Sequence, residues 1–131
     1  MADEIRLSVN MTVEKGDLKY TFYPTVASID LLGDAAAGAV QTITTASTGT
    51  ELALVGVTTR GMANFLNLSA GTKVEIGAYD GTAFRPFGQL NAGEPAVLRL
   101  SAQTGTTKSP VARVIEPTNG TAAVQWQVFS E

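Results

Sequence analysis

The chemistry available to this chain of 131 residues rests on carboxylates, hydroxyls, lysines and tyrosines, because the sequence contains no histidine and no cysteine. Their absence excludes disulfides, thiolate nucleophiles, imidazole bases and nearly all zinc or copper sites. Asp30 and Asp34 flank Leu31-Leu32-Gly33, a spacing that could place two carboxylates around calcium. Hard cations need several oxygen ligands, and no third carboxylate lies nearby. We therefore expect two solvated acids after a strand end, with no metal and no cofactor.

Catalysis would have to use a pair of carboxylates, as glycoside hydrolases do. A β fold brings together residues from distant strands, so no spacing in the sequence identifies such a pair. We therefore expect a protein that is not an enzyme. A hydrolase that uses carboxylates is the least favoured of the three functions considered below.

Aromatic rings present large apolar faces at low entropic cost and can form a binding platform for a sugar or peptide. The aromatic residues considered for such a platform are Tyr20, Phe22, Tyr23, Tyr79, Phe84, Phe87 and Trp126. Most have strand spacing that points them inward, but alternation places Tyr23 and Tyr79 off the core face. These two tyrosines are the candidate surface-binding residues. With the Thr-rich loops they motivate one alternative function, a carbohydrate-binding module that recognises a receptor.

Two other motifs have structural explanations. The glycines between residues 77 and 93 lack the Lys-Ser/Thr pair and helix of a phosphate-binding loop, so we interpret them as turn and bulge residues. Asn10, Asn67 and Asn119 each begin an Asn-x-Ser/Thr pattern. The chain starts without a basic or apolar leader, so we expect no secretory signal and consider these patterns coincidental.

The clearest strand signal runs from Ile5 to Val13, where apolar and polar residues alternate strictly, as in a half-buried strand. A second alternating run, Leu18 to Phe22, follows a Lys15-Gly16 turn. A two-residue loop there would set Val13 opposite Leu18 and keep the apolar residues of both strands on one face.

Two further hairpins carry dipeptides that tolerate the positive φ of a type I′ turn. Asp80-Gly81 would join residues 73–79 to 82–90, with Pro86 marking a bulge or an edge. Asn119-Gly120 would join residues 111–118 to 121–129. This last hairpin would place six residues on one core-facing side: Val111, Arg113, Ile115, Val124, Trp126 and Val128.

Shorter strands are expected at residues 28–32, 40–44, 52–57, 62–68 and 96–100, which brings the total to about ten. No window shows a helical stripe. The sequence therefore predicts a single all-β domain over residues 1–131, an antiparallel two-sheet β-sandwich of jelly-roll type.

The charge pattern limits the partners. The net charge is −3 and the basic residues are scattered, whereas a nucleic-acid surface needs a basic patch. No apolar run approaches the roughly 20 residues that span a bilayer. We therefore expect neither a nucleic-acid nor a membrane partner.

The stretch from Phe65 to Leu100 resembles small structural proteins of tailed bacteriophages. The resemblance rests on Phe65-Leu66-Asn67-Leu68, Val74-Glu75-Ile76-Gly77, Arg85-Pro86-Phe87 and Gly93-Glu94-Pro95-Ala96-Val97-Leu98-Arg99-Leu100. It covers a little over a quarter of the chain, and these motifs consist mostly of turn and core residues. No catalytic residue is carried over.

The resemblance implies a virion component that is made in the cytoplasm of a bacterial host. We expect a capsid decoration (cement) protein that binds the capsid exterior and stabilises the shell. Its partners would be the major capsid protein or other virion proteins, and the resemblance implies a homotrimer. A head-fibre, portal-vertex or tail accessory subunit is an alternative within the same class.

Overall fold

The structure, a computed structural model, describes residues 5–29, 35–45, 48–52, 54, 57–100, 108–114 and 120–130, with the backbone alone for residues 108–114. Within these residues the chain forms strands and no helix, and every pair of strands is antiparallel. The all-β prediction is confirmed. The strands are β1 (Ile5–Leu7), β2 (Met11–Lys15), β3 (Leu18–Phe22), β4 (Ala27–Ile29), β5 (Ala36–Ile43), β6 (Thr50–Glu51), β7 (Arg60–Asn67), β8 (Val74–Tyr79), β9 (Phe84–Leu90), β10 (Pro95–Arg99), β11 (Lys108–Val114) and β12 (Ala122–Ser130).

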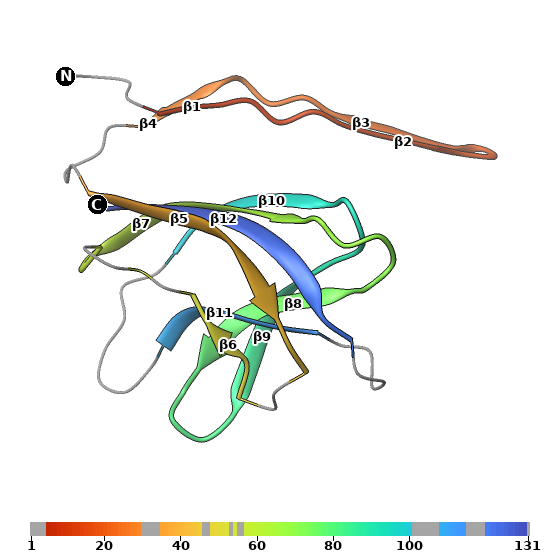
Figure 1. The fold of residues 1–131 in the computed structure, drawn as a ribbon. Coiled ribbons are helices and arrows are strands. Elements are labelled where there is room, and N and C mark those ends of the chain that lie inside the picture. Colours follow the sequence, from red (N-terminus) through yellow and green to blue (C-terminus); the bar gives the residue numbers. More distant parts are fainter. Residues whose placement is uncertain are drawn as a thin grey trace. The chain divides into compact units, whose positions relative to one another are not determined.

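The chain divides into two compact units, residues 1–32 and residues 33–131, and each is described by itself. The N-terminal unit contains two small sheets, β1 with β4 and β2 with β3 (Figure 1). The alternating run from Ile5 to Val13 is therefore divided between two strands with different partners. The expectation of one domain over the whole chain stays a prediction.

The β2–β3 hairpin has the two-residue loop that the sequence predicts, but its position was predicted wrongly. Lys15 pairs with Leu18, so the loop is Gly16-Asp17 and not Lys15-Gly16. The reason is that a tight hairpin turn requires positive φ at its first central residue, and Gly16 supplies a φ of 57°. The shift preserves parity, so Val13 lies opposite Tyr20 and the apolar residues still share one face.

The larger unit contains two four-stranded sheets (Figure 1). One has the order β10-β7-β12-β5 and the other the order β6-β11-β8-β9. Side chains from both sheets contribute to a common core, which gives the unit a sandwich-like architecture. The jelly-roll connectivity stays a prediction.

The predicted closing hairpin is wrong. β11 pairs with β8 and β6, whereas β12 pairs with β5 and β7 in the other sheet. Both edges of β12 are therefore paired. A strand at the centre of a sheet makes ladder hydrogen bonds along both of its edges, whereas the last strand of a hairpin at the edge of a sheet makes them along one. Asn119 of the expected turn and Ile115 of the expected core face lie outside the described residues, as do the side chains of Val111 and Arg113.

The β8–β9 hairpin exists, but its loop has four residues, because Tyr79 pairs with Phe84. The Asp80 side chain replaces the expected type I′ turn by accepting backbone hydrogen bonds within the loop. The bulge predicted at Pro86 is confirmed. Ile76 pairs with Gly88 and Gly77 with Pro86, so Phe87 has no partner on β8 and half of its surface is exposed.

The core of the larger unit lies around Trp126, whose side chain is completely buried. Val124, Trp126 and Val128 alternate along β12 and all face the core, as the sequence predicts. The other fully buried large side chains come from both sheets and their connections: Ile43, Leu52, Phe65 and Val74.

Asn67, at the end of β7, is the largest fully buried polar residue. Its Nδ2 donates to the Thr72 carbonyl at 2.7 Å and to the Leu90 carbonyl at 3.1 Å. Its Oδ1 accepts from the Ser69 amide at 3.0 Å and from the Ser69 hydroxyl at 2.7 Å. Leu90 ends β9 of the opposite sheet, so one amide group connects the two sheets at this end of the sandwich.

We expect Trp126→Ala to lower the free energy of unfolding by about 3–5 kcal/mol, as large-to-small changes in a packed core do. Thr121, five residues earlier and exposed, provides the control, because Thr121→Ala removes little buried area. Denaturant unfolding of both variants measures the difference. Equal and small losses would contradict the placement of β12.

We expect Asn67→Ala to destabilise the larger unit by about 1–3 kcal/mol for each buried group that it leaves without a hydrogen bond. Asn64 is the matched control on the same strand, because its amide makes an exposed hydrogen bond to Gln127. Chemical unfolding of Asn67→Ala and Asn64→Ala compares the two positions. If Asn64→Ala lowered the free energy of unfolding as much as Asn67→Ala, the buried hydrogen bonds of Asn67 would contribute no more to stability than an exposed one.

Candidate interaction surfaces

The structure does not test the carboxylates considered for a metal site. Asp30 and Asp34 lie outside the described residues. Among the residues that are described, no three Asp or Glu side chains are grouped so that they could hold a metal ion. In the same residues no helix is long and apolar enough to cross a membrane.

The acids with clearly shifted pKa values are turn residues. Asp80 Oδ1 accepts hydrogen bonds from the Thr82 and Ala83 amides at 2.8 and 2.7 Å, and Oδ2 pairs with Arg85 Nε at 2.8 Å. Led by the Ala83 amide, these donors lower the Asp80 pKa to about 2. Glu94 accepts from the backbone and side-chain amides of Asn91, and these bonds lower its pKa as well. Both carboxylates are held ionised, the reverse of the raised pKa that a general acid needs.

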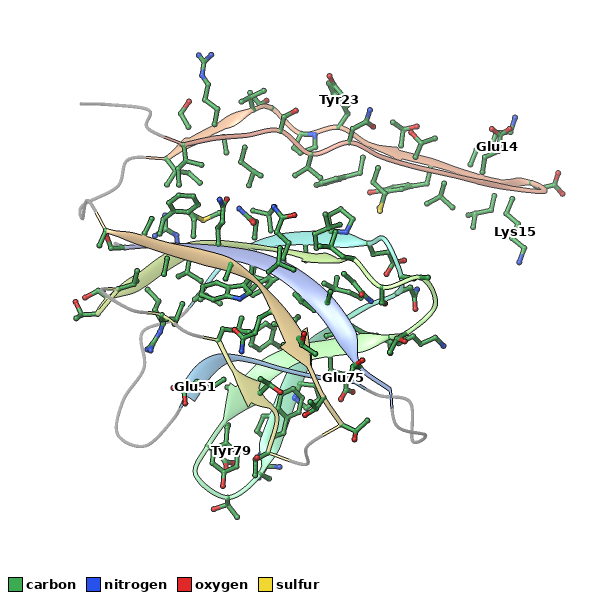
Figure 2. The ribbon with its side chains drawn as sticks, viewed as in Figure 1. Glu14, Lys15, Tyr23, Glu51, Glu75 and Tyr79 are labelled. Atoms are coloured by element: carbon green, nitrogen blue, oxygen red, sulfur yellow. The ribbon has the colours of Figure 1, made fainter. Side chains whose placement is uncertain are left out.

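The two candidate surface tyrosines belong to different units. Tyr23 follows β3, projects away from its hairpin and is 71% exposed (Figure 2). Tyr79 ends β8 next to the four-residue loop and is half-buried (Figure 2). Their role in binding stays a prediction.

The N-terminal hairpin presents an apolar face that its own unit does not cover. Met11 pairs with Phe22, Val13 with Tyr20 and Lys15 with Leu18, so one face of the β2–β3 ribbon carries five apolar side chains and, beside the turn, Lys15. Tyr20 is 52% exposed and Phe22 43% exposed. The sequence reasoning placed these rings in a core, because alternation identifies the apolar face of a strand but not what covers it.

The opposite face of the same hairpin is polar. Thr12 lies opposite Thr21, and Glu14 lies opposite Lys19 with an ion pair of 3.3 Å. Both ionised side chains are well exposed, so the pair contributes little to stability. The hairpin is therefore amphipathic, with a water-facing side and a side suited to an apolar partner.

The sheet β10-β7-β12-β5 has a second unusual surface on the side away from the core. Strand parity and register place fourteen residues there: Ala36, Gly38, Val40, Thr42, Met62, Asn64, Leu66, Pro95, Val97, Arg99, Ala123, Gln125, Gln127 and Phe129. We call this set the outer face. Its one ionisable member is Arg99, whereas a water-facing sheet usually carries many charged side chains.

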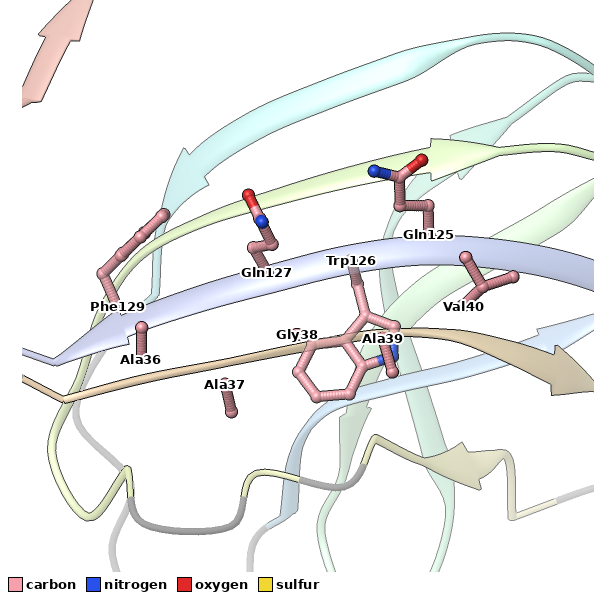
Figure 3. Close-up of a pocket in the computed structure, with 9 residues that line it drawn as sticks. All are labelled: Ala36, Ala37, Gly38, Ala39, Val40, Gln125, Trp126, Gln127 and Phe129. Atoms are coloured by element: carbon pink, nitrogen blue, oxygen red, sulfur yellow. The ribbon is translucent and has the colours of Figure 1, made fainter.

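A shallow hollow of about 390 Å³ lies where the outer face meets β5. Residues 36–40 form one wall, and Gln125, Gln127 and Phe129 point to one side of β12 while Trp126 points to the other (Figure 3). Gly38 lies tightly against β12, since a Cβ at this position would come within 2.8 Å of the Gln127 side chain. On the β5 side the hollow is thus bordered by backbone and small side chains, and on the β12 side by larger ones.

The sequence reasoning missed both surfaces. The signal that could have found the second is the run Ala35-Ala36-Ala37-Gly38-Ala39-Val40-Gln41-Thr42-Ile43, which has strand length but no charge and no proline. It was read only from residue 40 onward, because alanine and glycine have low strand propensity.

In comparisons with known proteins, no family model, no curated protein and no solved structure matches this chain.

We expect the Asp80 loop to make stability depend on pH. The folded pKa of about 2 lies below the ordinary value of 3.8, so Asp80 contributes stability above pH 4 and loses it as the pH falls toward 2. Asp80→Asn should be less stable than the unchanged protein at pH 7, and the gap should shrink at acid pH. Denaturant midpoints at several pH values measure it. A gap that stays constant with pH would contradict this assignment.

Proposed function

We propose that this protein is a structural component of a bacteriophage virion, a decoration protein that binds the capsid exterior and stabilises the shell. The proposal rests on the resemblance of residues 65–100 to small phage structural proteins. In the structure this stretch runs from the end of β7 to the residue after β10 and includes Asn67, so it supplies a framework more than a binding surface.

The observation that carries the proposal is the apolar face of the β2–β3 hairpin, which its own unit does not cover. A two-stranded hairpin is marginally stable in water, and a unit of 32 residues buries too little area to stand alone. An exposed apolar face of this kind marks a surface that a partner covers. We propose that the partner is the shell, made of the major capsid protein or a neighbouring virion protein.

Repetition explains how small contacts could stabilise a particle. A ligand that binds only the assembled state stabilises it by its binding free energy, and many copies on a symmetric shell add their effects. A disulfide-free sandwich suits a subunit that folds in the reducing cytoplasm of a bacterial host before it joins the virion. The homotrimer and the absence of catalytic function belong to the same proposal.

A carbohydrate-binding function is the second candidate, and the exposure of Tyr23 favours it. A largely exposed tyrosine ring has the chemistry of a sugar platform.

The copy number on the virion distinguishes a capsid decoration protein from the other virion positions. Many copies indicate the capsid lattice, whereas about a dozen or fewer indicate a portal vertex, head fibre or tail.

We expect particles that lack the protein to assemble but to rupture at a lower temperature and under osmotic shock, and to regain resistance when the purified protein is added back. Quantitative mass spectrometry of virions is the first measurement. Absence of the protein from purified particles would contradict the proposal that it is a virion component.

The hairpin face is tested in the same add-back assay. Tyr20→Lys places a charge on the apolar face and should reduce the restored resistance, while Thr21→Lys places the same charge on the polar face and should restore it fully. Equal restoration by both variants would show that this face does not contact the shell.

A further inference from the structure

The edges of the sheets differ in how they are protected against pairing with another chain. An exposed edge strand offers unpaired N–H and C=O groups, and proteins block such edges with charges, prolines, bulges or short strands. In the larger unit β10 carries Pro95 and Arg99, and β9 carries Arg85, Pro86 and a bulge. β6 has two residues, one of them Glu51. Three of the four edges are therefore blocked.

The N-terminal unit follows the same rule. β1 carries Arg6, β2 carries Glu14 and Lys15, and β3 carries Lys19. β4 has no charge but is three residues long. Across the described strands, blocking is the general condition of an edge.

β5 is the exception. It has eight residues, Ala36 to Ile43, with neither a charge nor a proline, and in the described residues it pairs only with β12. At its far end Gln41 Nε2 donates to the Glu51 carbonyl at 2.9 Å, so the β6 segment lies beside that part. The segment from Ala36 to Val40 borders the hollow instead (Figure 3). An extended strand could lie there and hydrogen-bond to the free edge.

We propose that β5 pairs with β5 of a second copy of this chain, antiparallel about a two-fold axis. Self-pairing brings no like charges together, because the segment has none. Alanine and glycine leave room for the two backbones to reach the spacing of about 4.8 Å between neighbouring strands. The other edges of a second copy would oppose β5 with proline, arginine or a bulge, so β5 is the best strand that the chain offers to itself.

This pairing joins two sheets into one continuous sheet with the order β10-β7-β12-β5-β5-β12-β7-β10. The interface is isologous and closes at two copies, and the edge strands that remain in the joined sheet are the two copies of β10, which carry Pro95 and Arg99. A two-copy mass excludes the homotrimer that the phage resemblance implies, so the pairing is proposed in place of that homotrimer, while a virion role is compatible with either assembly. The inference stands on the edge strands alone and does not depend on the virion proposal.

Sedimentation of the purified full-length protein over a range of concentrations tests the pairing. We expect a mass of two copies. Among the backbone amides of residues 36–40, those that point away from β12 should exchange about tenfold more slowly when nine copies in ten are paired. A mass of one copy at every concentration would overturn the proposal. So would a three-copy mass with residues 36–40 unprotected.

A matched pair of substitutions separates edge pairing from docking of the outer face. Val40 and Val97 lie on opposite edge strands of the same sheet and are 61% and 48% exposed. Val40→Lys puts a charge on the uncharged edge strand, as on the edges that are blocked, and should shift the protein to single copies, whereas Val97→Lys should leave pairing unchanged. Equal disruption by both would show that the outer face, and not the β5 edge, makes the contact. The exchange measurement needs no substitution and remains decisive if Val40→Lys does not fold.

Discussion

The buried amide of Asn67 is the constraint on which the larger unit depends. It sits where the chain leaves one sheet for the other, and it hydrogen-bonds to the carbonyl of Leu90 on the opposite sheet. The same side chain satisfies the polar groups of the connection through Ser69 and Thr72. With this end fixed, β7 and β12 hold Phe65 and Trp126 against the second sheet, and the core closes around them. A polar group that is fully satisfied specifies one arrangement more sharply than an apolar residue would.

Alternation along each strand was sufficient to predict the all-β class, the core residues of β12 and the bulge at Pro86. These features depend on local rules: a two-residue period and the missing N–H of proline. Which strands pair with each other was harder to predict, because tertiary packing decides the pairing. β12 combines with β5 and β7 although Asn119-Gly120 carries a hairpin signal, and the Asp80 loop is set by side-chain hydrogen bonds that a dipeptide rule does not include. The candidate surfaces were missed for a related reason, since a half-buried and an uncovered apolar face have the same period.

Several charges of this chain lie where they oppose contact with another chain. Arg85 and Arg99 lie on sheet edges, and Glu14 and Lys19 lie on the polar side of the hairpin. The β5 edge carries no charge, the outer face carries one, Arg99, and the hairpin face that contains Tyr20 and Phe22 carries one, Lys15. The charged surfaces therefore face water, and the nearly uncharged surfaces can contact protein, although the described residues form no basic or acidic patch.

Trp126 is the single tryptophan of the chain, and it lies in the wall between the core and the hollow beside β5. All tryptophan fluorescence of the protein therefore originates at one buried indole. Its emission reports the opening of the sandwich without any attached dye, and the ring is separated from the β5 edge by one strand. The protein thus contains its own optical probe, placed between the packing that holds the fold together and the strand where a second chain would arrive.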